Sequence, residues 1–314
     1  MRLTYIDPQV LPVLEVIGQH DYSKITVEEG RAMYRQAAAF ALPVRPNCRV
    51  EEFVLPRRDG TPIPCKAIFP PGAGKSLPVV ISYMGGTFVG TTLEFIGGYE
   101  SHIAEFAGCI VVVPLHRVPP EHRYPAAYDD CYDVYAWMAR NAGQIGGDPS
   151  RIALHGESAG ATLAASVCIE ARDRGETQPL MQVLAEPLLD HEAETPSLNE
   201  LSIMLSRATL RLGSSYYFGE ERPAKRASPL RVDDLSGLAP AYIVTAALDP
   251  LRDEGYAYAV RLRQAGVPVI HTCYEGQIHG FLSMIGSVDQ ARIAFHQACG
   301  VLRLAFAGGL RQPI

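Results

Sequence analysis

From residue 79 onward, short apolar runs rich in β-branched residues alternate with longer stretches of helical periodicity. The apolar runs lie at residues 79–83, 109–114, 151–155, 181–185, 241–245 and 267–274. The helical stretches lie at residues 128–142, 159–172, 253–265 and 289–306. Alternation of this kind is typical of crossover units that build a mostly parallel sheet with helices on both faces. We therefore predict an α/β fold with a mostly parallel sheet.

Two more strands are expected ahead of this alternation, at residues 50–55 and 64–69. Between them lie Asp59 and Gly60, and an Asp-Gly pair between two alternating runs is a strong hairpin signal. The two strands of this hairpin and the six runs above make an eight-stranded sheet with one antiparallel edge.

Two segments fall outside the alternation and are interpreted as a helical cap over the sheet. The first has helical periodicity at residues 8–17 and 27–40, and the second is polar and irregular. The predicted parts are an N-terminal helical cap segment (1–45), a cap insertion (190–231) and the main α/β domain (46–189 and 232–314).

The charge balance and the absence of long apolar segments limit the partners. Lys and Arg number 28 against 34 Asp and Glu, for a net charge of -6 without a dense basic run, which argues against nucleic acid. No segment approaches the roughly 18 apolar residues that span a bilayer. The first residues also lack the apolar core of a signal peptide. We expect no membrane span and a cytoplasmic location.

The seven cysteines are odd in number, scattered, and never spaced as C-x-x-C. A zinc site or a disulfide framework therefore has no support in the sequence. Cys109 begins an apolar run, where a cysteine behaves as a small buried hydrophobic residue.

A Gly-Glu-Ser-Ala-Gly pentapeptide at residues 156–160 directly follows an apolar run and directly precedes an alanine-rich helical stretch. In a strand-turn-helix, small glycines allow a sharp turn that exposes the serine hydroxyl above the sheet. Ser158 is thus a candidate nucleophile, and the amide of Ala159 at the helix start is placed to bind an oxyanion. On local grounds alone, Ser158 is explained equally well as a helix N-cap.

A serine nucleophile needs a base within hydrogen-bond reach, held in the right tautomer by a carboxylate. Of the nine histidines, His279 lies in a loop after the last apolar run, where open α/β sheets build sites, whereas His271 lies inside that run. For the carboxylate, Asp249 directly follows another apolar run. Asp253 competes with it, but its position suits the start of a helix.

Together these residues resemble the hormone-sensitive-lipase-like esterases of the α/β-hydrolase superfamily, from about residue 45 onward. Besides the serine motif, residues 117–127 (RVPPEHRYPAA) are similar to that family's R-L-A-P-E-x-x-x-P-A-A stretch, and residues 249–255 (DPLRDEG) to its acid motif. The order Ser158, Asp249, His279 also matches these hydrolases. The resemblance implies a doubly wound sheet with a helical cap, no cofactor, and hydrolysis of small-molecule esters with short to medium acyl chains. It also implies a homodimer, as an expectation for the family.

The chain departs from the family in its oxyanion loop, where H-G-G-G is replaced by Met84, Gly85, Gly86 and Thr87. The resemblance assigns the amides of Gly86, Thr87 and Ala159 as oxyanion donors, with Gly85 supplying the turn. A β-branched residue is penalised at positive φ, and methionine cannot make a histidine's hydrogen bonds. Two alternatives to a general carboxylesterase therefore stay open. They are a specialised acyl hydrolase for a lactone, amide or natural-product ester, and a catalytically silent ligand-binding protein.

Overall fold

The computed structural model describes residues 5–17, 24–37, 42–88, 96–221 and 224–309. Its eight strands form one sheet in the order β1-β2-β4-β3-β5-β6-β7-β8, antiparallel at β1-β2-β4 and parallel from β4 to β8. The strands are β1 (Arg49–Pro56), β2 (Pro62–Phe69), β3 (Leu77–Tyr83), β4 (Ile110–Pro114), β5 (Gly147–Glu157), β6 (Gln182–Ala185), β7 (Ala241–Ala246) and β8 (Val269–Tyr274). The predicted eight-stranded, mostly parallel α/β fold is confirmed.

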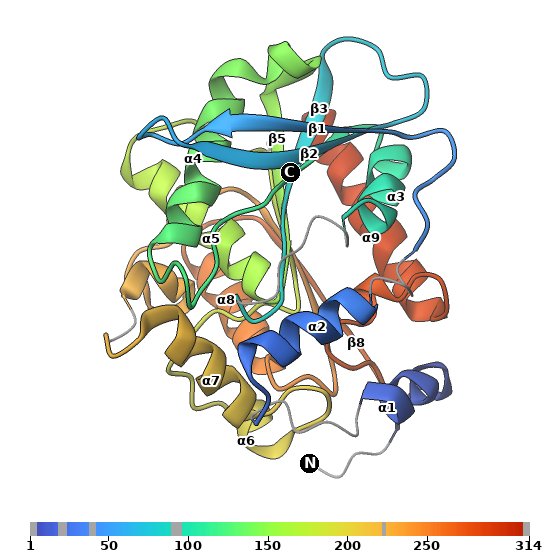
Figure 1. Cartoon of the computed structure of the whole chain (residues 1–314), viewed down its shortest axis with the longest axis vertical. Helices are drawn as coiled ribbons and strands as arrows, with labels where there is room; N and C mark the ends of the chain where they lie inside the picture. Colours follow the sequence, from blue (N-terminus) through green and yellow to red (C-terminus); the bar gives the residue numbers. More distant parts are fainter. Residues whose placement is uncertain (1–4, 18–23, 38–41, 89–95, 222–223, 310–314) are drawn as a thin grey trace.

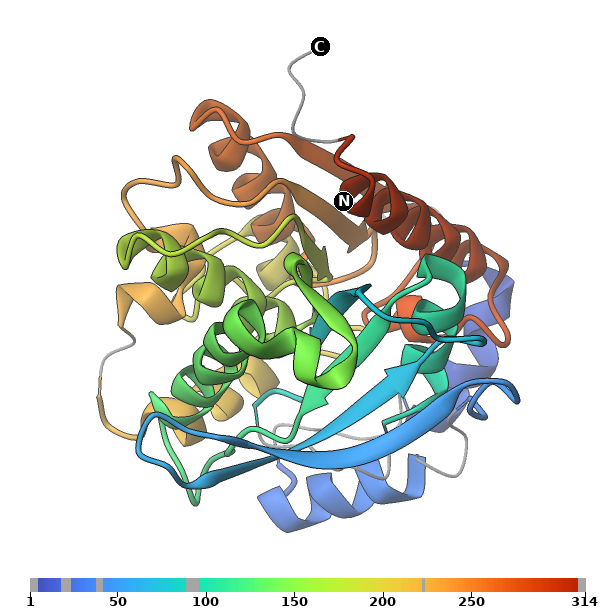
Figure 2. The same ribbon diagram turned by 90° about the horizontal axis from the view of Figure 1, so that it is seen from above.

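Helices cover both faces of the sheet, as Figures 1 and 2 show. One face packs against α4 (Ala126–Asn141), α5 (Ala159–Asp173) and α8 (Arg252–Gln264), and the other against α3 (Gly98–Ala107) and α9 (Asp289–Phe306). The four crossover helices predicted from periodicity are present, while α3 was not predicted.

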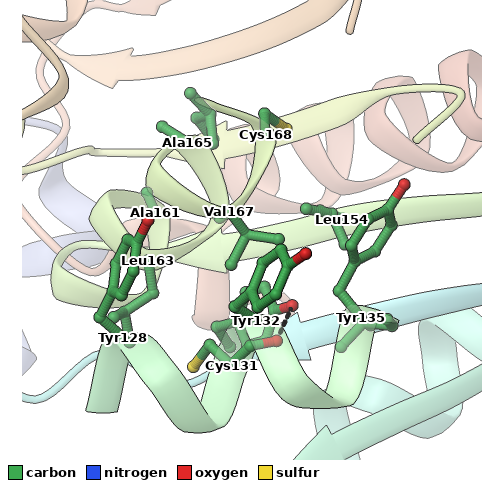
Figure 3. Packing of buried hydrophobic residues seen from close by; sticks show 14 of the residues in the cluster. Tyr128, Cys131, Tyr132, Tyr135, Leu154, Ala161, Leu163, Ala165, Val167 and Cys168 are labelled. Carbon is green, nitrogen blue, oxygen red and sulfur yellow. Dashed lines mark hydrogen bonds between the residues drawn. The ribbon is translucent and has the colours of Figure 1, made fainter. Parts of the chain in front are cut away.

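The strands between the two layers are buried on both sides, as their continuous apolar runs require. Every residue of β4 is buried, and so is every residue of β7. On the first face, tyrosines and small residues of α4 pack against Leu163 and Val167 of α5 (Figure 3). Each fully buried apolar side chain of this size contributes about 1.5–3 kcal/mol to stability.

The predicted hairpin is also present. β1 and β2 pair in register from Arg49 opposite Phe69 to Pro56 opposite Pro62. Gly60 adopts φ 83° in the turn, a conformation that glycine takes without steric cost.

Four helices lie outside the sheet layers, in the lower half of Figure 1: α1 (Leu11–Ile17), α2 (Val27–Ala37), α6 (Pro196–Glu200) and α7 (Arg207–Phe218). The helical periodicity of the N-terminal segment corresponds to α1 and α2, and residues 38–40 of the second predicted stretch lie outside the described residues. The segment 190–231, predicted to be irregular, instead contains α6 and α7. Thr195 caps the start of α6, and its hydroxyl accepts a hydrogen bond from the amide of Leu198. Ser206 caps the start of α7 in the same way, with the amide of Thr209 as donor.

The proline-rich stretch that contains Arg117 is tied to the core through one buried carboxylate. Asp130 of α4, whose side chain is fully buried, accepts hydrogen bonds from the guanidinium groups of Arg57 and Arg117 and from the amide of Arg117. In the same stretch, Glu121 pairs bidentately with Arg31 of α2. The N-terminal segment is thereby linked to the main domain.

In the described parts of the chain, no helix is long and apolar enough to cross a membrane. All seven cysteines lie within these parts and are free. No group of three or more His, Cys, Asp or Glu side chains among the described residues could hold a metal ion.

Candidate active site

Ser158 lies between the last residue of β5 and the first residue of α5, with φ 56°. Positive φ is unfavourable for a side chain of this kind, so the surrounding turn must hold it there. The two flanking glycines explain how the turn is possible. A Cβ on Gly156 would lie 2.2 Å from the carbonyl oxygen of Gly160, and one on Gly160 would lie 2.0 Å from that of Tyr83. No residue other than glycine fits either position.

The structure brings Ser158, His279 and Asp249 together from three separate loops. The Nε2 atom of His279 lies 3.1 Å from Oγ of Ser158, and its Nδ1 atom lies 2.9 Å from Oδ2 of Asp249. The second oxygen of Asp249 accepts from the amide of Leu251 at 2.9 Å, which fixes the carboxylate plane. Ser158 occupies the N-cap position of α5, but its side chain makes no capping hydrogen bond, so capping does not account for its hydroxyl group.

The competing acid, Asp253, lies in the first turn of α8, as expected for a residue at a helix start. Its carboxylate accepts from the amide of Ser197 at 2.8 Å and from Arg252 at 2.9 Å. It therefore stabilises the start of α6 and is not the acid bonded to His279.

Three carboxylates surround the imidazole of His279. Burial by itself lowers the pKa of this histidine. The charge and hydrogen bond of Asp249 raise it, as do the charges of Glu186 and Glu157, and these effects outweigh burial. The result is a pKa raised to about 9. Burial also raises the pKa of the Glu157 and Glu186 carboxyl groups above the usual value.

Glu186 was not predicted as a site residue. It directly follows β6, is fully buried, and adopts φ 46°. Its Oε2 atom accepts from the amide of Gly280 at 2.6 Å, next to His279, while Oε1 has no hydrogen-bond partner. The signal was present in the sequence, because an acidic residue directly after an apolar run at 181–185 lies at the same sheet edge as Asp249.

The loop with Gly85, Gly86 and Thr87 follows β3 and lies against the serine turn. A Cβ on Gly85 would meet the carbonyl oxygen of Glu157 at 2.8 Å. Gly86 has φ 94° and Thr87 has φ 53°, so the threonine does occupy the region that is costly for a β-branched residue. Among the described residues, the amides of Gly86, Thr87 and Ala159 have no hydrogen-bond acceptor. Their assignment as oxyanion donors stays a prediction.

Comparison with known proteins agrees with this geometry. The family described as "alpha/beta hydrolase fold" matches residues 80–283. The chain belongs to this family. Its relatives include the Esterase LipI of Mycobacterium tuberculosis (strain ATCC 25618 / H37Rv), 34% identical over 313 residues that cover 96% of this chain and 96% of that protein. The Arylesterase of Saccharolobus solfataricus is 30% identical to this chain, in a match that covers 88% of this chain and 92% of that protein.

A solved structure of a hyperthermophilic esterase from the archaeon Pyrobaculum calidifontis superposes on this α/β hydrolase with a TM-score of 0.88. The two are 33% identical, and the match covers 96% of this chain and 98% of that one. The resemblance to hormone-sensitive-lipase-like esterases drawn from the sequence motifs is confirmed.

Proposed function

We propose that this α/β hydrolase cleaves small-molecule esters with short to medium acyl chains through an acyl-enzyme on Ser158. Its family and its esterase relatives over the full chain make it a carboxylic ester hydrolase of the carboxylesterase type. The observation that carries the proposed mechanism is the continuous hydrogen-bonded line from Ser158 Oγ through His279 to Asp249.

In the first half-reaction, Ser158 Oγ attacks the ester carbonyl carbon while Nε2 of His279 takes the hydroxyl proton. Asp249 holds the Nδ1–H tautomer and stabilises the imidazolium that forms. The protonated His279 then gives its proton to the leaving alcohol as the carbon–oxygen bond breaks. In the second half-reaction, His279 takes a proton from water, which attacks the acyl carbon. The protonated His279 then returns a proton to Ser158 Oγ as the bond between this oxygen and the acyl carbon breaks, which releases the acid and restores the free enzyme.

The tetrahedral intermediates carry a negative oxygen that needs preformed donors. The amides of Gly86, Thr87 and Ala159 are proposed for this role, with Gly85 allowing the close approach of the loop to the serine turn. Their lack of hydrogen-bond acceptors among the described residues supports the proposal. Losing one such donor costs on the order of 3 kcal/mol of transition-state stabilisation.

A specialised acyl hydrolase for a lactone, amide or natural-product ester is the second candidate, because Thr87 lies at φ 53° where the family pattern has glycine. The assembled Ser158, His279 and Asp249 argue against a silent ligand-binding protein. Homodimerisation and a cytoplasmic location stay predictions from the sequence.

The test is hydrolysis of p-nitrophenyl esters from acetate to decanoate by the wild type and by Ser158→Ala. Rapid turnover of short and medium chains, lost in the variant, is the expected result. Turnover confined to lactones or amides in a parallel panel supports the specialised hydrolase. Absence of any serine-dependent hydrolysis overturns the proposal.

A further inference from the structure

Helix α7 of the cap region packs directly on Thr87 of the oxyanion loop. A Cβ added to Gly213, in the middle of α7, would lie 2.2 Å from Cγ2 of Thr87 and 3.2 Å from its carbonyl oxygen. Gly213 has no such atom, and the threonine methyl group occupies the space. Glycine weakens a helix interior by roughly 1 kcal/mol relative to alanine, so this contact accounts for a residue that the helix alone disfavours.

The next residue of the loop makes a second contact with the same helix. The Phe88 side chain is 1% exposed and stacks on the ring of Tyr217, with centroids 4.1 Å apart and an interplanar angle of 8°. Tyr217 lies four residues after Gly213, so both contacts come from one face of α7. Two consecutive loop residues are therefore held by this helix.

The other side of the loop is held by the serine turn. Gly85 approaches the carbonyl oxygen of Glu157, and Gly160 approaches the carbonyl oxygen of Tyr83, at distances that leave no room for a Cβ. The loop is thus enclosed between the serine turn and α7. A Cβ on Gly213 would also lie 3.2 Å from the Thr87 carbonyl oxygen and 3.4 Å from its Cβ, so we expect the loop backbone to shift together with the Thr87 side chain.

We propose that α7 holds the oxyanion loop in its active conformation, with Gly213 as the positioning residue that accommodates the Thr87 side chain. The inference rests on the proposed function, because it takes the amides of Gly86 and Thr87 as oxyanion donors. It also follows that the cap contributes to turnover. Thr87, which replaces a glycine of the family pattern, and Gly213 in α7 form a complementary pair of residues.

The experiment is a double-variant cycle of Gly213→Ala and Thr87→Gly, measured with p-nitrophenyl butyrate. Gly300→Ala is the matched control, because Gly300 lies in helix α9 and an added Cβ meets no atom within 4 Å. We expect Gly213→Ala to lower kcat by about tenfold to a hundredfold, less than the roughly 10²–10³ for complete loss of one oxyanion donor because the donor is displaced and not removed, with KM changed less than threefold. In the Thr87→Gly background the same substitution lowers kcat less than threefold. Gly300→Ala leaves both constants unchanged.

Active-site titration with an organophosphate, such as diethyl p-nitrophenyl phosphate, separates positioning from folding. A purely structural role for Gly213 would lower the melting temperature and the titratable fraction while kcat per titrated site stays at the wild-type value, and that result overturns the inference. So does an equal loss of kcat in both backgrounds. If Gly213→Ala alone does not fold, the double variant must fold and turn over as Thr87→Gly does. An inactive wild type would instead contradict the proposed function.

Discussion

Replacing Asp249 by asparagine exchanges one carboxylate oxygen for an NH2 group, and the structure determines which one. Oδ1 accepts from the amide of Leu251 at 2.9 Å, so the asparagine carbonyl keeps that position and its NH2 group faces Nδ1 of His279. An NH2 group donates and cannot accept, so the histidine adopts the Nε2–H tautomer. That tautomer cannot take the proton of Ser158.

We expect Asp249→Asn to lower kcat by about 10³–10⁴, which corresponds to about 4–5.5 kcal/mol of transition-state stabilisation. The assay is the initial rate with p-nitrophenyl butyrate, normalised to folded protein by circular dichroism. Asp253→Asn is the control, because Asp253 bonds Ser197 and Arg252 and not the histidine. It should lower the melting temperature and leave kcat within threefold. Retention of more than a tenth of wild-type kcat by Asp249→Asn would refute the reasoning.

Three other predictions follow from the charged groups. Only neutral imidazole accepts the serine proton, so kcat/KM of the wild type should rise with pH until about 9, the raised pKa of His279; a plateau by pH 7 contradicts this. Above its own raised pKa, Glu186 is ionised and its charge raises the pKa of His279, so Glu186→Gln should move the rising limb to lower pH. An unmoved limb contradicts the role given to Glu186. Asp130→Ala leaves the guanidinium groups of Arg57 and Arg117 without their buried acceptor, and denaturant unfolding should show a loss of about 3–5 kcal/mol; a loss under 1 kcal/mol would be inconsistent with that network.

Much of the fold could be predicted because the strand signal is local. A parallel strand buried on both sides must be a continuous apolar run, and β4 and β7 show that pattern in the sequence itself. Helix α3 was missed because its moderate apolar periodicity begins at two glycines, Gly97 and Gly98. A Cβ on Gly98 would meet the carbonyl oxygen of Leu42 at 1.9 Å, so a tertiary contact selects this glycine.

The proximity of Ser158, Asp249 and His279 was predictable because each residue follows an apolar run at the carboxyl edge of the sheet. Other features of the site depend on contacts between distant segments. The role of Glu186 depends on the amide of Gly280, 94 residues away. The need for glycine at position 213 depends on its contact with Thr87, and nothing near either residue in the sequence indicates that contact. Such pairings appear only once the chain has folded.

The central claim is that Ser158 carries the acyl group, and mass spectrometry tests it most directly. The protein is incubated with a p-nitrophenyl alkylphosphonate, digested, and compared with Ser158→Ala treated in the same way. The account predicts one added phosphonyl group per chain, located on Ser158, with release of one equivalent of p-nitrophenol and neither event in the variant. A label on another residue, or equal labelling of Ser158→Ala, would contradict it.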